Sequence, residues 1–120
     1  MKKILVVEDD KFLANAYMVK LAKENFEVKL ARNGEEALAV FTEFKPDLML
    51  LDLVMPKKDG FEVLEQLKGK TRVPILIASN LGQKEDIDRG MSLGAADFVV
   101  KSEMPISNVV EKIKKLLHVS

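Results

Sequence analysis

Residues 2–10 read K-K-I-L-V-V-E-D-D, a short apolar run that ends abruptly in three carboxylates. Apolar and polar residues do not alternate within the run, which is typical of a strand that is buried on both faces of a parallel sheet. Three more apolar runs follow, at residues 48–51, 75–78 and 98–100. We therefore expect four buried core strands, the first of them at residues 4–7.

A fifth segment, residues 26–31, alternates instead, because Glu27 and Lys29 separate its apolar residues. This pattern indicates an edge strand, where charged side chains discourage mispairing. The five strands begin near residues 4, 26, 48, 75 and 97, and each interval of 22 to 27 residues has room for a strand and a crossover helix. The sequence therefore predicts repeated βα units.

Helical periodicity fills the intervals between the strands. It is clearest after Pro105, which suits a first helical turn and precedes an apolar stripe that lies opposite lysines. Asp10 and Asp59 are expected to cap the first and third helices. The stretch 83–93 is the poorest helix, since it contains Gly90. Together these patterns predict an α/β fold, a doubly wound five-stranded parallel sheet in the flavodoxin-like order 2-1-3-4-5 with helices on both faces.

Length and composition exclude several classes of protein. A chain of 120 residues predicts a single domain over residues 1–120 without an output domain. Nineteen Lys and Arg balance 19 Asp and Glu, so no net charge attracts nucleic acid or anionic membrane. Without cysteine, and with His118 as the one histidine, thiolate chemistry and His-cluster metal sites are excluded. No apolar stretch approaches the roughly 20 residues of a transmembrane helix, so a cytoplasmic location is expected. Nothing after Val119 resembles a linker, which favours a stand-alone protein. The basic stretch 68–72 is expected to be a solvated loop.

Polar side chains follow every predicted core strand. In chain order the strands end in Glu8 and Asp9, in Asp52, in Ser79 and in Lys101. The carboxyl ends of parallel strands share one edge, and open α/β folds bind ligands outside that edge. Clustered carboxylates repel one another unless a cation relieves the repulsion, and so few fixed oxygen ligands suit Mg²⁺. With a lysine and a hydroxyl nearby, the pattern indicates a site where a carboxylate is phosphorylated.

These residues resemble the receiver domain of two-component response regulators over essentially the whole chain. The features that carry the resemblance are, in order, Glu8 and Asp9, Asp52, Met55 and Pro56, Asp59 and Gly60, Ser79, and the run G-A-A-D-F-V-V-K from Gly94 to Lys101. The resemblance implies that Asp52 takes a phosphoryl group from a phosphohistidine of a sensor histidine kinase or a histidine phosphotransfer protein. It also implies a signalling switch that catalyses its own phosphorylation and dephosphorylation, and not an enzyme with a separate substrate.

The resemblance further implies a role for each site residue. Mg²⁺ would be held by Asp9, by Asp52 and by the backbone carbonyl of Val54, while Glu8 would act mainly through a metal-bound water. Lys101 would pair with a phosphoryl oxygen.

Two residues would form the switch. The hydroxyl of Ser79 would bond another phosphoryl oxygen once the phosphate is present, which is the differential contact that a two-state switch needs. Phe98, which is otherwise a core residue, would follow inward. The surface formed by the fourth helix, fifth strand and fifth helix would then change and bind a downstream protein target. No nucleic acid or membrane partner is expected.

Four positions depart from the pattern of the family. Asn80 stands where many receivers have a small residue, so it either narrows access to the nucleophile or adds a hydrogen bond. Ser102 stands where many receivers have a proline after a cis peptide, and a non-proline cis bond costs about 2.5–4 kcal/mol, which makes a cis bond much less expected here. Val54 and Leu81 are apolar at positions that tune phosphate lifetime. Neither side chain can position an attacking water, which predicts slow self-dephosphorylation.

Other functions remain open on the sequence alone. A Mg²⁺-dependent aspartyl-phosphate phosphohydrolase commonly has a second Asp two residues after the nucleophile, where this chain has Val54. A flavin- or nucleotide-binding domain needs a small-residue phosphate loop after the first strand, where Glu8, Asp9 and Asp10 would repel a phosphate. A receiver-like interaction module that is not phosphorylated is the third alternative, and the complete set of site residues argues against it.

Overall fold

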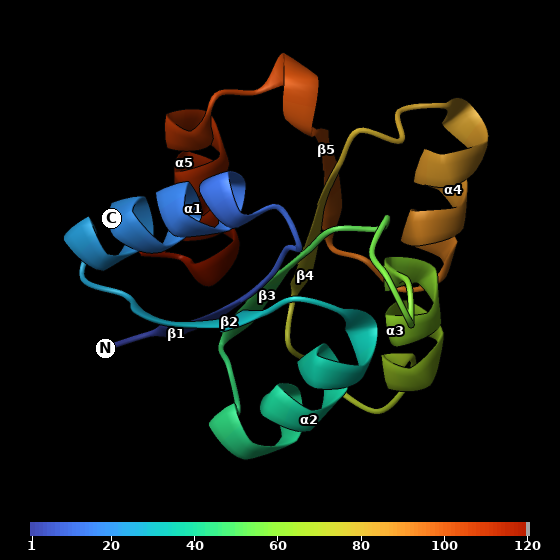
Figure 1. The fold of residues 1–120 in the computed structure, drawn as a ribbon, viewed down its shortest axis with the longest axis horizontal. Coiled ribbons are helices and arrows are strands. Elements are labelled where there is room, and N and C mark those ends of the chain that lie inside the picture. The colour runs from blue at the N-terminus through green and yellow to red at the C-terminus, as the bar shows by residue number, and fades with distance from the viewer. Residues whose placement is uncertain (120) are drawn as a thin grey trace.

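Five short parallel strands form one sheet in the centre of the molecule (Figure 1). The computed structural model describes residues 1–119. The sheet order is β2-β1-β3-β4-β5. The order and the parallel pairing confirm the predicted fold, and the observed strand bounds lie within a residue or so of those predicted. The strands are β1 (Lys3–Val7), β2 (Glu27–Ala31), β3 (Leu48–Leu51), β4 (Ile75–Ser79) and β5 (Asp97–Val100).

Helices cover both faces of the sheet, as predicted (Figure 1). The helices α1 and α5 pack side by side on one face, and α2 and α3 contact each other on the opposite face. None of the helices within residues 1–119 is long and apolar enough to cross a membrane. The helices are α1 (Lys11–Lys23), α2 (Gly34–Phe44), α3 (Gly60–Leu67), α4 (Lys84–Ser92) and α5 (Ile106–Leu117), and a short 3₁₀ helix, η1 (Lys101–Glu103), follows β5.

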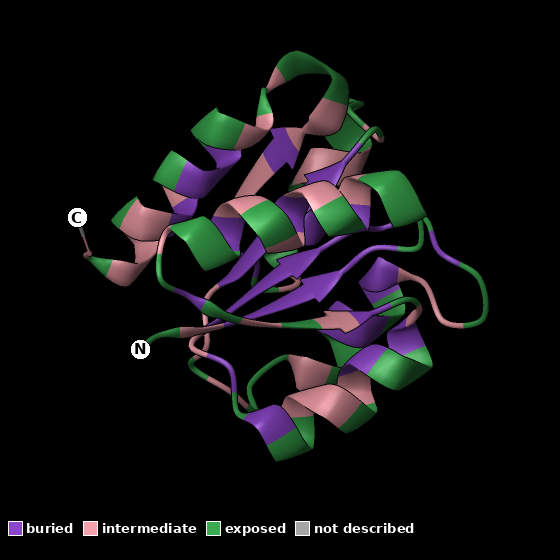
Figure 2. Ribbon diagram, turned by 60° about the vertical axis from the view of Figure 1, so that its left-hand side comes forward, coloured by how far each residue is buried: buried purple, intermediate pink, exposed green. Residues whose placement is uncertain are grey.

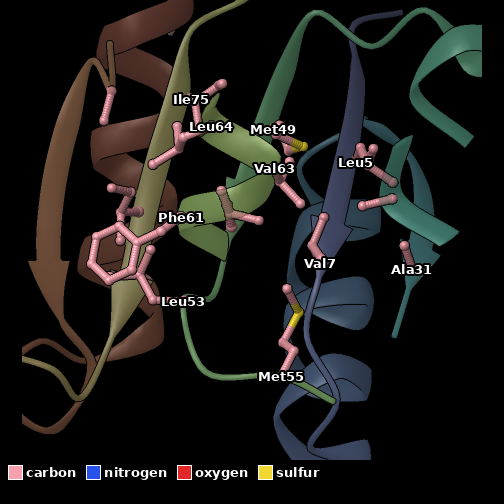
Figure 3. Packing of buried hydrophobic residues seen from close by; sticks show 14 of the residues in the cluster. Leu5, Val7, Ala31, Met49, Leu53, Met55, Phe61, Val63, Leu64 and Ile75 are labelled. Carbon is pink, nitrogen blue, oxygen red and sulfur yellow. The ribbon is translucent and has the colours of Figure 1, made fainter. Parts of the chain in front are cut away.

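Each core strand contributes side chains to two separate apolar clusters. On β1, Leu5 and Val7 enter the cluster under α2 and α3, whereas Ile4 and Val6 enter the cluster under α1 and α5. Figure 3 shows the first cluster, where Leu64 of α3 packs over the sheet. Figure 2 shows the central strands buried in purple between helices whose outer faces are largely green. Burial on both faces explains why the core strands carry no polar alternation.

Short polar side chains begin the first three helices. The Asp10 carboxylate accepts the N–H groups of Phe12 and Leu13 at 2.9 and 3.1 Å. Asp59 and Glu62 form a capping box at the start of α3. Both predicted caps are confirmed. Pro105 was expected inside the first turn of α5 and instead stands immediately before it, where its extended backbone turns the chain into the helix.

The helix α4 buries fewer of its residues than any other α-helix of the described chain. Its only buried residue is Gly90, and no side chain caps its N-terminus. A Cβ atom at Gly90 would lie 2.6 Å from Cδ1 of Ile77, so the absence of a side chain allows the helix backbone to approach the sheet. Arg89 adds a tie to α3, because its guanidinium lies 4.1 Å from the ring centroid of Phe61. This is the helix that the sequence predicts to be poorest.

Candidate functional site

Four strands bring polar side chains to one edge of the sheet. Glu8 and Asp9 follow β1, Asp52 follows β3, Ser79 ends β4, and Lys101 follows β5. Three of these residues are unusual among polar groups in being nearly inaccessible: Glu8 is 3 % exposed, Asp52 6 % and Ser79 0 %. Burying an ionisable group costs desolvation free energy, which an apolar side chain at the same position would not cost. Buried ionisable groups at the edge of an open sheet therefore indicate a functional site.

Lys101 pairs with two buried carboxylates. Its Nζ atom donates to Oδ2 of Asp52 at 3.0 Å and to Oε1 of Glu8, and its side chain is only 13 % exposed. Burial alone would lower the pKa of Lys101, but the hydrogen bonds and charges of the two carboxylates outweigh burial and raise it. The ammonium group therefore stays charged. This pairing joins the ends of β1, β3 and β5.

The carboxylates themselves form a cluster suited to a cation. Glu8, Asp9 and Asp52 each offer an oxygen, and these oxygens lie within 4.8 Å of one another. Burial raises the pKa of Glu8 above its ordinary value; the hydrogen bond from Lys101 opposes this shift and the charge of Asp52 adds to it. Three carboxylates and one ammonium have a formal charge of −2, which one divalent cation would neutralise. The all-oxygen donor set fits a hard cation.

Val54 follows the nucleophile candidate and faces solvent. Its side chain is 59 % exposed, and its N–H group donates to Oδ1 of Asp52 at 3.4 Å. A backbone N–H group of the segment after β3 therefore helps to orient the Asp52 carboxylate. The proposed ligand role of the Val54 carbonyl stays a prediction.

Ser79 and Phe98, the two switch candidates, occupy different places. The hydroxyl oxygen of Ser79 accepts the N–H group of Leu81 at 3.2 Å, so it is engaged within its own loop. Phe98 pairs with Ile77 inside the sheet and is half-buried against the cluster under α2 and α3. It lies below the acidic edge and close to α4, since a Cβ atom at Gly90 would meet its ring at 3.4 Å. Their movement stays a prediction.

The two unusual loop residues meet each other. The side-chain oxygen of Asn80 accepts the N–H group of Ser102 at 3.0 Å, so it ties the loop after β4 to the turn that carries Lys101. Of the two alternatives for Asn80, the structure gives it the hydrogen bond. The peptide bonds of the described residues are all trans, including the bond between Lys101 and Ser102.

Sequence reasoning missed the structural roles of two residues at the site, of which Gly60 was named only as part of the resemblance. A Cβ atom at Gly60 would lie 2.4 Å from the backbone oxygen of Asp52, so only glycine allows α3 to start against the acidic loop. The signal was visible as a glycine directly after the cap residue Asp59. Tyr17 of α1 is the second: burial, and then the charges of Glu8 and Asp52, raise its pKa to about 12. No local pattern in the sequence distinguishes Tyr17 from an ordinary core residue.

Comparisons with known proteins agree with this geometry. The family model described as response regulator receiver domain matches residues 4–114. A probable transcriptional regulator, ycf27 of Cyanophora paradoxa, is 39 % identical over 116 residues, which cover 97 % of this chain and 48 % of that protein. The transcriptional regulatory protein ResD of Bacillus subtilis is 38 % identical over 115 residues, which cover 96 % of this chain and 48 % of that protein. This chain therefore spans about half the length of these relatives.

A solved structure extends the likeness to three dimensions. The BeF3-activated N-terminal receiver domain of Klebsiella pneumoniae RstA matches with a TM-score of 0.91 at 29 % identity, covering 97 % of this chain and 98 % of that chain. This chain therefore combines the fold of that receiver domain, a family match over most of its sequence, and an acidic cluster at the edge where the strands end. The chain belongs to the response regulator receiver domains of two-component signalling systems.

Proposed function

We propose that this chain is a phosphoacceptor switch in which Asp52 receives a phosphoryl group from a phosphohistidine. The donor would be a sensor histidine kinase or a histidine phosphotransfer protein, acting in the cytoplasm. The observation that carries the proposal is the buried Asp52 carboxylate, which lies in an acidic cluster and is held by a buried lysine. A nucleophilic carboxylate beside cationic groups is the arrangement that phosphoryl transfer requires.

The residues of the site divide the chemistry between them. A carboxylate oxygen of Asp52 attacks the phosphorus atom; the new O–P bond forms as the P–N bond breaks, and the imidazole nitrogen keeps the electron pair and takes a proton. Lys101 is placed to exchange its contact with Asp52 for one with a phosphoryl oxygen. Within residues 1–119 the hydroxyl oxygen of Ser79 accepts the N–H group of Leu81, so its own proton can be donated to another phosphoryl oxygen.

The acidic cluster fits Mg²⁺. Asp9, Asp52 and the carbonyl of Val54 would hold the ion, with Glu8 acting through a bound water. Bound Mg²⁺ supplies positive charge that stabilises the phosphoryl oxygens in the transition state. The side chains of the site select the kind of metal ion, because carboxylates without histidine or cysteine favour hard cations such as Mg²⁺.

Phosphorylation would change a protein-binding surface and turn over no separate substrate. The new bond to Ser79 would pull the loop after β4 toward the phosphate, and Phe98 of β5 would follow inward. A downstream protein would read the altered surface of α4, β5 and α5. Two observations support a movable α4: it buries only Gly90, and it lacks a side-chain cap.

The intact mass of the protein after incubation with acetyl phosphate tests the proposal. With Mg²⁺ we expect one added phosphoryl group, and none in the absence of Mg²⁺ or in the Asp52→Asn variant. The Asp47→Asn variant, immediately before β3, is the matched control and should be phosphorylated like the unchanged protein. A phosphohistidine donor is tried in parallel, since it covers a site closed to small donors. Failure of both donors with folded protein refutes the proposal, and steady release of phosphate over many turnovers indicates a phosphohydrolase instead.

A further inference from the structure

An apolar hollow lies at the end of the sheet opposite Asp52. It measures about 400 Å³. Phe41 of α2, Leu67 of α3, Pro46 and Val73 provide its apolar lining, and Lys45 and Lys70 stand in its wall. Phe41, Leu67 and Val73 are each only partly covered by the rest of the chain. A hollow of this size accepts one or two large side chains.

A second hollow continues the first along the loop between α3 and β4. It measures about 160 Å³ and shares Leu67, Thr71 and Val73 with the first hollow as a common wall. Leu64 and Leu93 extend its apolar lining toward the end of α4. We call the two hollows together the basal groove. Two neighbouring hollows, the first lined mainly by apolar atoms and the second by polar atoms as well, fit a short segment that inserts two side chains.

Hydrogen bonds hold the basal groove in shape. Within the loop after α3, the N–H of Lys68 donates to the carbonyl of Leu64 and the N–H of Lys70 to the carbonyl of Leu67, both at 2.9 Å. The hydroxyl oxygen of Thr71 accepts the N–H of Val73 at 3.1 Å. Binding of a partner in the groove therefore requires little loss of conformational entropy from these loops, which favours binding.

The charged side chains that line the basal groove are all positive. Lys45 and Lys70 line the first hollow and Lys68 lines the second, while Arg72 is exposed in the same loop. Within residues 1–119, neither hollow has an Asp or Glu in its lining. The whole chain has no net charge, so the lysines of the groove form a local basic surface and not part of a general excess. The sequence alone predicts only a solvated loop here.

We propose that the basal groove binds an acidic peptide segment of a partner protein, with two large apolar side chains in the hollows and carboxylates against the lysines. The apolar lining selects a peptide over a nucleic acid, whose backbone offers no comparable side chains. The lysines select acidic flanks, since positive and negative potentials must match across an interface. Pro46 precedes β3 and Asp52 follows it, so the four residues of β3, about 13 Å at the rise of a strand, separate the groove from the acidic edge. The partner would therefore bind without covering Asp52.

A titration followed by amide NMR of the full chain tests the proposal. The probe is the peptide acetyl-Glu-Asp-Leu-Phe-Asp-Glu-amide, taken to millimolar concentration. We expect saturable shifts of the amide signals of Thr42, Leu67, Thr71 and Val73. One control peptide replaces Leu and Phe by Ser and Asn, and another replaces the four acids by Lys; both should bind more weakly than the probe.

Charge reversal tests the role of the lysines. The double variant Lys45→Glu and Lys70→Glu is expected to weaken binding of the probe by about threefold to thirtyfold, the sum of two exposed ion pairs. The matched control, Lys23→Glu with Lys115→Glu, places the same charges on α1 and α5 and should leave binding unchanged. Phosphorylation by acetyl phosphate should be the same in both double variants, which separates this test from that of the Asp52 site.

Three results would overturn the proposal. The first is an absence of saturable shifts at the groove with the acidic apolar probe. The second is equal binding of the Lys-substituted control peptide, which removes charge complementarity. The third is saturable binding of a short RNA or of phosphatidylserine vesicles at the same residues with none of the probe, which assigns the basic surface to a different class of partner.

Discussion

The pKa of Tyr17 offers a direct measurement of the electrostatics of the acidic site. Tyr17 is 2 % exposed, and its pKa of about 12 exceeds the ordinary value of 10.0. The phenol is neutral in the folded protein, because burial and the charges of Glu8 and Asp52 both disfavour a tyrosinate. Since the folded pKa lies above the unfolded one, the stability due to Tyr17 is complete below pH 10 and is lost as pH rises through 12.

The size of this effect follows from the shift. Two pKa units at 1.36 kcal/mol each correspond to about 2.7 kcal/mol of folding free energy, lost between about pH 10 and pH 12. Tyrosine has one copy in the chain and tryptophan none, so the tyrosinate absorbance reports this residue alone. The absorbance is read immediately after a pH jump, while far-ultraviolet circular dichroism verifies that the protein is folded. In denaturant the midpoint should return to about 10.

Two variants sharpen the measurement. Tyr17→Phe should abolish the signal. Asp52→Asn should lower the Tyr17 midpoint by a small part of the shift, because burial is the larger cause and the charge of Asp52 the smaller one. A midpoint near 10 in protein that is demonstrably folded would refute the reasoning, and so would a midpoint that Asp52→Asn leaves unchanged.

Three further changes probe the site. Lys101→Met should lower the free energy of unfolding in urea by about 3–5 kcal/mol, because it strips two buried carboxylates of their partner, and added Mg²⁺ should restore more stability to the variant than to the unchanged protein. Equal effects of Mg²⁺ on both would contradict this. Gly60→Ala should destabilise by about 1–3 kcal/mol in the same assay, since its Cβ would strike the backbone of Asp52; unchanged stability would count against the close approach. Val54→Asp should shorten the lifetime of the phosphorylated protein, because a carboxylate can position water where valine cannot; loss of phosphate followed by mass should then be faster, and an identical lifetime would show that position 54 plays no part.

Much of the fold was predictable, because its signals are local. A core strand buried on both faces is apolar throughout, so the runs at β1, β3 and β4 are visible without knowledge of their neighbours. The acidic site follows from the topology alone, since parallel strands end at a common edge and Glu8, Asp9 and Asp52 come directly after two of them. Caps such as Asp10 are equally local.

Other features depend on residues that are distant in sequence. The bond between Asn80 and Ser102 joins two loops, and the lining of the basal groove combines residues 41–46 with residues 67–73. No periodicity links such segments. The contribution of Glu8 and Asp52 to the pKa of Tyr17 likewise needs the packing of α1 on the sheet. Side-chain geometry between loops is set by tertiary packing, which a single sequence does not encode in a local pattern.

The contact of α4 through Gly90 has a consequence for the slow dynamics of the molecule. The other helices pack on the sheet through interdigitated side chains, and these contacts must break before the helix can shift. At Gly90 the buried contact is backbone against Ile77, so displacement of α4 uncovers little apolar surface. Amide hydrogens of α4 should therefore exchange with deuterium sooner than those of α5, whose Val109, Val110 and Ile113 are fully packed. Because a shift of α4 exposes little apolar surface, we expect a small displacement of the loop after β4 to be enough to move this helix.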